Sequence, residues 1–538
     1  MTSIQEPILE VPRKKSSLAL GMAHNSLWNM GGLFMSALLG FVTSPLLIHL
    51  LGKDHYGLMI LLVSILTPLG LLDFGIGEAT VKYVAESIGR RDATLTGKYL
   101  RSTLLFNLSM GVVGGWVVIS CAGFLTTSLF NIPANSQVIA RHCLYWIGIH
   151  WCVMQVRQTF IGTVTAMQRF GILNVGTFIS QAITIGAGLG VLFLGGNLLD
   201  LIRTQAIIAA IVGLGWLIIA KRLLPGILFI PRLDWGTLSK TLGFGFWQML
   251  NNVGGILGHQ SGRWLLGVLL PVSAVGFYDI GMQLVTMVYL VTYKVGQVLF
   301  PAVSQMQGEG HDEQAARFVV QANWVLTTLA ISCFVPLIVL SHDLLLLWVG
   351  PDFAANTTVV LRILAFGDAA SCLFAIHNFY LLGTGRSKWL APMSFAQGSI
   401  TFTVSALLIP RLGLVGAGWG MASSSIVHVS MLILMWKRIF RVWIPARVYF
   451  SATFSQFIVG VVTAIGFMQL RSTITWSPNW ILIGVAGSVC AAISAIIIIT
   501  IDRYLPGGSE RRELLLQLCV SRIPLLSRLS INHPYGKI

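Results

Sequence analysis

The chain has 538 residues, of which 55% are hydrophobic and only 10% are charged, and its mean hydropathy is +0.79. This composition excludes an ordinary soluble enzyme and indicates a membrane protein with many spans. The formal net charge of +16 would also suit a nucleic-acid binder, but basic residues beside apolar spans usually reflect topology and contact with anionic lipid.

Apolar windows long enough to cross a bilayer, about 20 residues each, recur along almost the whole chain. The sequence therefore predicts an all-α polytopic protein with about fourteen transmembrane helices. The predicted spans are 24–50, 56–81, 102–125, 140–164, 171–194, 200–220, 242–270, 275–302, 318–342, 357–383, 389–409, 415–436, 450–470 and 480–501. Residues 1–23 form a polar arm without a small-residue cleavage site, so we expect a retained cytosolic tail rather than a signal peptide.

Lys and Arg fall mostly on one side of these spans if the N-terminus is cytosolic. By the positive-inside rule both termini then face the cytosol, including a C-terminal tail over residues 502–538. The seven cysteines are scattered without the paired spacings that metal sites or disulfide frameworks require, so neither is predicted.

Two halves of the chain resemble each other. "YGLMILL" at Tyr56 and "VGFYDIG" at Val275 each open a span, and Gly57 and Gly89 match Gly276 and Gly308 at one shift of 219 residues. A duplicated bundle is common in transporters. We expect an N-lobe over 24–222, a cytosolic linker over 223–241 and a C-lobe over 242–440, six helices each and related by a pseudo-twofold axis along the membrane normal. Residues 441–501 add two further helices.

The stretch "LLDFGIGEATVKYVAE" at residues 71–86 places charges and glycines in the second span. Glycines allow close helix approach or a bend, and Asp73 should face a wet interior because hydrocarbon penalises a carboxylate. The segment is predicted to be a gating helix, with a kinked structural helix as the alternative. Glu78 and Lys82 are spaced for an i, i+4 salt bridge at the helix end.

Ionisable residues at membrane depth concentrate in spans two, four, seven, eight and ten, which predicts that these helices line a cavity. Arg157, Arg263 and Lys294 lie furthest from both faces and have no acidic neighbour within one turn in sequence. They indicate a cationic site, and guanidinium suits a phosphate through paired hydrogen bonds. We also assign His259, which lies in the same predicted span as Arg263, to this predicted substrate site.

Each of these residues has an alternative reading. Arg157 could pair with Asp73 or Glu78, Arg263 could snorkel outward, and Lys294 could snorkel toward the cytosolic face. Asp368 and His377, in the tenth predicted span, are candidates for gating or ion coupling together with Asp73 and Glu78. They could equally be polar groups packed between helices.

Several motifs occur in an order that resembles the polysaccharide-exporter branch of the multidrug, oligosaccharidyl-lipid and polysaccharide flippase superfamily. They are the Tyr56 motif with its continuation to residue 86, "AVGFYDIGMQLV", "LLLLWVGPDFAAN", "LLGTGRSKW" and "LIPRLGLVGAGWGMA". The resemblance covers roughly residues 24–440. It implies two six-helix lobes around a central cavity and alternating access between the two membrane faces.

The resemblance also implies a substrate: undecaprenyl-diphosphate-linked sugar repeat units, moved across the bacterial cytoplasmic membrane for surface polysaccharide synthesis. A cationic cavity would hold the diphosphate while the polyprenyl tail stays in lipid. No phosphate-binding loop of the G-x-x-x-x-G-K-[ST] type is present. The energy source is therefore left open between an ion gradient (H⁺ or Na⁺), the membrane potential and consumption of the product.

Three other functions compete with this reading. A lipid II flippase would handle a chemically close substrate, and a drug or cation antiporter of the same superfamily should favour buried acidic residues. A glycan polymerase or glycosyltransferase needs a large outer loop with catalytic side chains, whereas the longest outer connection, around "TTSLFNIPANSQV", has no ionisable side chain. We therefore expect no enzyme, no cofactor and no nucleic-acid partner. The expected partners are membrane lipids and a polysaccharide polymerase, and the resemblance implies a monomer.

Overall fold

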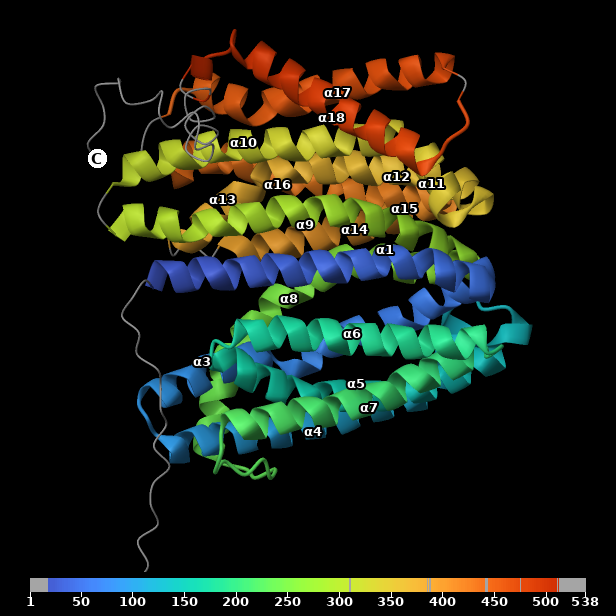
Figure 1. The fold of residues 1–538 in the computed structure, drawn as a ribbon, viewed down its shortest axis with the longest axis vertical. Coiled ribbons are helices and arrows are strands. Elements are labelled where there is room, and N and C mark those ends of the chain that lie inside the picture. The colour runs from blue at the N-terminus through green and yellow to red at the C-terminus, as the bar shows by residue number, and fades with distance from the viewer. Residues whose placement is uncertain are drawn as a thin grey trace, which may run out of the picture. The chain divides into compact units, whose positions relative to one another are not determined.

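The computed structural model describes the backbone of residues 18–308, 311–384, 386, 389–440, 444–474, 476–509 and 511. Within its helices, the side chains of residues 18–34, 244–248, 250–251, 291, 294–305, 307–308, 312 and 383 lie outside the description. The described part is all-helical, as the sequence predicts (Figure 1). Most of the predicted arm and tail, residues 1–17 and 512–538, lies outside it.

Eleven helical stretches of the described chain are long and apolar enough to cross a membrane. The protein is therefore a multi-pass membrane protein, although the predicted count of fourteen spans is not confirmed. Helix α5 (Ala134–Ala166) is not among the eleven although it has 33 residues, because its sequence is too polar. The first two predicted spans are separated within α1 (Leu18–Ser64) by Gly52, whose backbone angles (φ 77°, ψ 164°) are not helical, so the break falls in the predicted gap between residues 50 and 56.

The chain forms two compact units. Unit 1 holds the described residues up to Ile280 and the segment Ser394–Ala417. One buried hydrophobic core of this unit includes Leu104, Phe160 and Trp216, which come from three different helices. The helices of unit 1 are α1 (Leu18–Ser64), α2 (Leu66–Leu69), α3 (Ile76–Gly89), α4 (Ala93–Phe124), α5, α6 (Phe170–Phe193), α7 (Leu198–Leu223), α8 (Trp235–Leu269), the first part of α9 (Val272–Gly308), α14 (Leu390–Leu412) from Ser394 on, and the first part of α15 (Leu414–Ser423).

The two glycines that the internal repeat aligns, Gly57 and Gly276, lie against each other where α1 and α9 cross. A carbon at the Cβ position of Gly276 would lie 3.2 Å from the Cα atom of Gly57. At Gly57 it would collide with the backbone carbonyl oxygen of Val272. The crossing therefore requires residues without a side chain, as close helix packing in membranes often does.

The second predicted span, 56–81, is not one continuous helix. After α2 the chain forms a 3-10 turn, η1 (Gly70–Asp73), and then two residues with left-handed backbone angles, Phe74 (φ 47°) and Gly75 (φ 66°). Helix α3 begins only at Ile76. Glycine adopts positive φ without strain, so Gly75 explains why the break falls here, and Phe74 accepts an uncommon conformation beside it.

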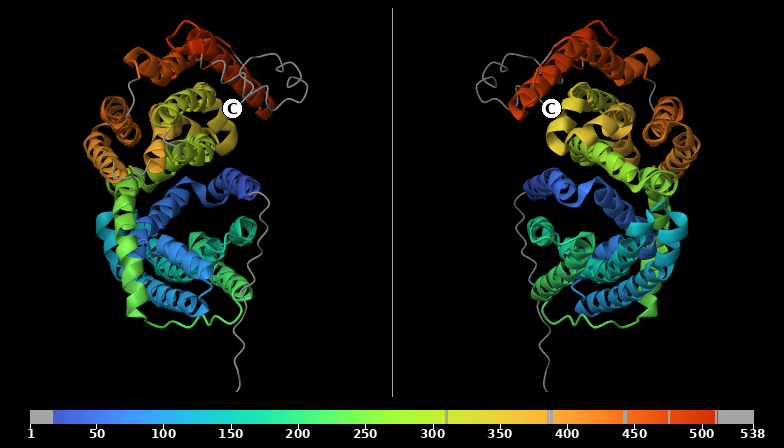
Figure 2. Two further views of the ribbon diagram at one scale, coloured as in Figure 1. Left: turned by 90° about the vertical axis from the view of Figure 1, so that its left-hand side faces the viewer. Right: turned by 90° about the vertical axis from the view of Figure 1, so that its right-hand side faces the viewer.

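Unit 2 holds Gly281–Met393 and the described residues from Gly418 on. Helices α17 (Ala446–Thr473) and α18 (Trp480–Asp502) lie side by side and both pack on α10 (Asp312–Val339) (Figures 1 and 2). A buried core that includes Val319, Phe374 and Tyr449 joins α10, η3 and α17. The elements of unit 2 are the second part of α9, α10 (Asp312–Val339), α11 (Ser341–Val349), α12 (Pro351–Ser371), η3 (Cys372–Phe374), α13 (Ala375–Gly383), the second part of α15 (Leu414–Ser423), α16 (Ser425–Leu434), η5 (Met435–Ile439), α17 (Ala446–Thr473) and α18 (Trp480–Asp502).

Candidate functional site

Arg157 lies in the second half of α5, half-buried, and no carboxylate in the described part of the chain pairs with it. Its Nη2 atom donates to the sulfur of Met154 at 2.8 Å. The structure therefore does not support the alternative in which Arg157 pairs with Asp73 or Glu78. His150, about two turns earlier on the same helix, lies within electrostatic reach of the guanidinium. The charge at this place is positive and unbalanced, which suits an anionic group.

Asp73 ends the η1 turn directly before the break in the second predicted span. Its Oδ2 atom accepts a hydrogen bond from the backbone N–H of Gly77 at 3.2 Å, so the carboxylate lies at the N-terminus of α3 where the helix dipole favours negative charge. Its Oδ1 atom is buried and has no hydrogen-bond partner in the described structure. A buried carboxylate oxygen without a donor is costly, so it is suited to bind a proton or a cation.

Arg263 of α8 is held by a carboxylate of the neighbouring helix α9. Its Nε and Nη2 atoms donate to Oδ1 of Asp279 at 2.9 and 2.6 Å, and Tyr56 donates to Oδ2 at 3.4 Å. The Arg263 and Asp279 side chains are only 18% and 14% exposed. The expectation that Arg263 has no acidic neighbour holds along the chain but not in space. The outward-snorkelling alternative is also not what the structure shows.

The surroundings of this ion pair extend to the start of the second predicted span. The Nη1 atom of Arg263 donates to the carbonyl oxygen of His259 and to Oε1 of Gln260, both at 3.3 Å. Gln260 in turn donates to Thr67 of α2 at 3.1 Å. The imidazole of His259 is exposed, and its backbone rather than its ring contacts Arg263. A network of five side chains thus ties α1, α2, α8 and α9 together within unit 1.

In unit 2, Asp368 lies in the last turns of α12, and its side chain has no hydrogen-bond or ion-pair partner among the described residues. Tyr289 of α9 and Cys372, one turn further along, lie within electrostatic reach of it. Neither group supplies a positive charge. Asp368 is therefore a half-buried carboxylate in a membrane span without a cationic partner, which is uncommon in structural positions.

His377 has a different environment from Asp368, although both were predicted for gating or coupling. It is fully buried on α13, with its Nε2 atom 3.1 Å from the hydroxyl of Tyr449. Its ring stacks on Phe374 and contacts the ring of Phe440. The structure thus places His377 in an aromatic core between helices, which matches its packed-residue alternative.

Two predicted site residues remain. Glu78 is exposed in the first turn of α3, and Lys82 lies over the ring of Tyr83, with its Nζ atom 5.1 Å from the ring centre. Lys294 lies within α9, but its side chain is outside the described residues, so its contacts stay a prediction. In the part of the chain that the structure describes, no three His, Cys, Asp or Glu side chains gather as metal ligands would.

The connection that was predicted as a linker, 223–241, docks on the start of α4. Arg101 donates from Nε to the carbonyl oxygen of Leu228 at 3.1 Å, and Asp234 caps α8 by accepting from the backbone N–H of Thr237 at 3.0 Å. That hydrogen bond lowers the pKa of Asp234. Hydrogen bonds from Thr94 and from the backbone of Leu95 lower the pKa of Asp92, the cap of α4, in the same way.

Sequence reasoning missed the importance of Asp279 and His150. Both lie in predicted spans. The relevance of Asp279 comes from the packing of α8 against α9, whereas that of His150 follows from its spacing to Arg157 on one helix. The signal for Asp279 is its place in the repeated motif "VGFYDIG", directly after Tyr278. His150 falls seven residues before Arg157, which places it on nearly the same face of α5.

Comparison with known proteins places the chain in a family. The sequence profile described as "Polysaccharide biosynthesis protein" matches residues 22–307. A Shigella flexneri protein named as an O-antigen transporter is 20% identical over 431 residues, which are 78% of this chain and 97% of that protein. A Haloferax volcanii protein named as a flippase of low-salt glycan biosynthesis is 20% identical over 379 residues, 70% of this chain and 75% of its own length.

Solved structures share the fold. The lipid II flippase MurJ in an inward closed conformation superposes with a TM-score of 0.68 at 13% identity, covering 88% of this chain and 98% of MurJ. An inward-facing multidrug transporter of the MATE family and the MOP superfamily superposes with a TM-score of 0.60 at 12% identity. The match covers 84% of this chain and 96% of that transporter. These relatives are transporters or flippases by name rather than enzymes. The chain belongs to the polysaccharide biosynthesis protein family and shares the fold of these solved transporters.

Proposed function

We propose that the protein is a flippase that moves undecaprenyl-diphosphate-linked oligosaccharide repeat units across the bacterial cytoplasmic membrane for surface polysaccharide synthesis. The family match and the names of the Shigella and Haloferax relatives support the transport of a lipid-linked glycan. The observation that carries the proposal is Arg157: a half-buried guanidinium inside the membrane with no carboxylate partner in the described structure. A diphosphate is the kind of group that would satisfy it.

In this mechanism Arg157 binds the diphosphate, Lys294 adds a second cation, and Arg263 contributes only when its pair with Asp279 opens. The sugars follow the head group into the cationic pathway while the polyprenyl tail remains in lipid. Alternating access then exposes the pathway to the other face. In the predicted topology, with both termini cytosolic, loading takes place on the cytosolic side.

Asp73 and Asp368 are proposed as the groups that couple transport to an ion gradient. Each is a carboxylate inside the membrane that lacks a cationic partner in the described structure. Binding of H⁺ or Na⁺ removes the cost of the uncompensated charge, and releasing the ion restores it. The protonated and ionised states of each group therefore favour different packing of the surrounding helices, which is the requirement for coupling.

The test is flipping of a fluorescent undecaprenyl-diphosphate oligosaccharide in proteoliposomes. Arg157→Gln should lower the rate about ten-fold or more, since it removes charge-assisted hydrogen bonds to the diphosphate. Arg141→Gln, at the other end of α5, is the matched control and should transport normally. Asp368→Asn should abolish the response to an imposed pH or Na⁺ gradient without abolishing substrate binding.

A multidrug or cation antiporter is the second candidate, and the same two carboxylates favour it, because an organic cation could pair with them. Wild-type proteoliposomes distinguish the two functions directly. If they extrude organic cations and leave the lipid-linked sugar in its original leaflet, the flippase proposal is wrong and the antiporter takes its place. To test for a lipid II flippase, unlabelled lipid II is added as a competitor of the fluorescent oligosaccharide carrier. Strong inhibition of flipping by lipid II would indicate that lipid II is the preferred substrate.

A further inference from the structure

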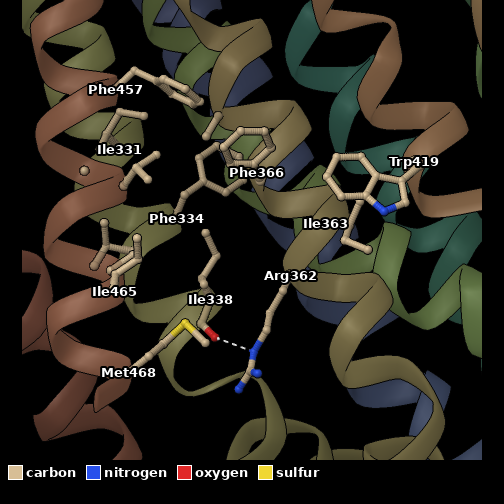
Figure 3. Close-up of a pocket in the computed structure, with 15 residues that line it drawn as sticks. Ile331, Phe334, Ile338, Arg362, Ile363, Phe366, Trp419, Phe457, Ile465 and Met468 are labelled. Carbon is tan, nitrogen blue, oxygen red and sulfur yellow. Dashed lines mark hydrogen bonds between the residues drawn. The ribbon is translucent and has the colours of Figure 1, made fainter. Parts of the chain in front are cut away.

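Unit 2 contains an apolar pocket of about 260 Å³, open toward the bilayer. It lies between α10, α12, α15 and α17, with Ile331 and Phe457 on one side and Ile363 and Trp419 on the other (Figure 3). Three of the lining side chains, Phe366, Trp419 and Ile465, are 38%, 43% and 54% exposed, so the mouth faces lipid. An apolar cavity of about 150 Å³ already takes up benzene, so this pocket has room for a segment of an alkyl chain.

Among the described residues that line the pocket, Arg362 is the one with a charged side chain. Figure 3 shows its side chain at one end of the pocket, next to Ile338. Its Nε atom donates to the carbonyl oxygen of Ile338 at 3.2 Å and to the hydroxyl of Ser341 at 2.9 Å. These bonds fix the guanidinium where α10 ends and α11 begins. Its two terminal nitrogens have no acceptor in the described structure and remain available to a ligand.

The nearest carboxylate does not neutralise Arg362. Asp343 is within electrostatic reach of it, but its oxygens accept from Nε and Nη2 of Arg471 at 2.9 and 2.8 Å. The third donor group of Arg471 is taken by the carbonyl oxygen of Ile474, and its guanidinium lies over the ring of Trp476. Two arginines therefore lie near one carboxylate. Because Asp343 pairs with Arg471, the positive charge of Arg362 is not neutralised.

We propose that this pocket binds a membrane glycerophospholipid, with one acyl chain in the apolar groove and the phosphate on the terminal nitrogens of Arg362. A phosphate accepts the paired hydrogen bonds that a planar guanidinium offers, and the chain buries apolar surface that the pocket otherwise exposes. The surplus charge favours an anionic lipid such as a phosphatidylglycerol. In the predicted topology the Arg362 end faces outward, so the lipid belongs to the outer leaflet.

This site is separate from the residues proposed for transport, and it does not depend on which substrate is flipped. All its residues belong to unit 2, and one wall is α17, which lies outside the predicted repeat. A lipid seated there bridges α17 to α10 and α12. It would stabilise the packing of the two C-terminal helices against the rest of unit 2.

The test uses a phosphatidylglycerol with a photoreactive diazirine on one acyl chain, in phosphatidylcholine proteoliposomes of the full chain. Cross-linked peptides should come from α10, α12 and α17. Ile465→Trp fills the mouth of the pocket and should lower labelling several-fold. Ile458→Trp is the matched control, because Ile458 is 61% exposed one heptad earlier on the same helix and does not line the pocket.

The phosphate contact is tested by competition with unlabelled lipids. Phosphatidylglycerol should displace the probe from the wild type about ten-fold better than diacylglycerol, which lacks the phosphate. Arg362→Gln should remove this preference. Arg362→Lys should reduce it, because lysine keeps the positive charge but lacks the paired N–H donors of the guanidinium. Arg411→Gln, an exposed arginine at the end of α14, should leave the preference intact.

Three results would overturn the proposal. Labelling spread evenly over all lipid-facing helices would show that the pocket holds no particular lipid. Equal labelling of the Ile465→Trp and wild-type proteins would show that the chain does not enter the groove. Displacement of the probe by a polyprenyl phosphate but not by phosphatidylglycerol would assign the pocket to an isoprenoid chain instead.

Discussion

The ion pair between Arg263 and Asp279 provides the sharpest test of the structure, because each residue alone has an alternative role. Changing Arg263 to Gln leaves Asp279 as a carboxylate that is 14% exposed, with only the Tyr56 hydroxyl, 3.4 Å away, donating to it. Breaking a buried pair by removing one partner costs about 3–5 kcal/mol. In a membrane the unfolded reference state also finds partners, so the lower end, about 3 kcal/mol, applies.

The assay is a double-mutant cycle on thermal unfolding in nanodiscs. Arg263→Gln and Asp279→Asn should each destabilise the protein by about 3 kcal/mol, roughly a hundred-fold in the unfolding equilibrium. The double variant should recover more than half of either loss, because neither an unpaired cation nor an unpaired anion is left. Recovery requires that the two side chains touch, as their 2.6 Å contact indicates.

Transport by the same variants separates structure from binding. If the double variant recovers stability but not flipping, Arg263 has a role in transport besides its pairing with Asp279. If it recovers both, the pair is structural and Arg157 and Lys294 are left to bind the diphosphate. Single-variant losses that simply add in the double variant would refute the pairing itself.

Three further predictions concern contacts outside the transport residues. Gly57→Ala should destabilise the protein by about 1–3 kcal/mol in thermal unfolding, because the new methyl group collides with the Val272 carbonyl, whereas Gly123→Ala in open space on α4 should be neutral or stabilising. Asp502→Asn should cost about 3–5 kcal/mol, since it leaves Arg511, 2% exposed and bonded to Asp502 at 2.7 Å, without its carboxylate; an unchanged melting temperature would contradict this pairing. Asp234→Ala should lower the melting temperature at neutral pH, and the difference should shrink in acid. The pKa of Asp234 is lowered in the folded state, so its contribution is present above its ordinary pKa of about 3.9 and is lost as the pH falls through the lowered value. A difference that grows in acid would show that the cap is not the ionised carboxylate.

The sequence predicts the fold well where apolar length decides the structure. The all-helical architecture, the protein family and most helix positions follow from hydropathy and ordered motifs. The exceptions are polar or broken segments: α5 is too polar to count as a span by hydropathy, and the predicted helix 56–81 breaks at Phe74 and Gly75. The glycines of that stretch indicated a bend, but only the backbone angles show where it falls.

The candidate site depended more on tertiary structure. Sequence alone determined which helices carry charge at membrane depth, because hydrocarbon penalises ions wherever they fall in a span. It could not determine which charges are neutralised, since partners come from other helices: Arg263 meets Asp279 across two helices, whereas Arg157 meets no carboxylate in the described structure. Electrostatic energy depends on distance in space, and the distance between two side chains on different helices is set by packing, which the periodicity of a single span does not encode.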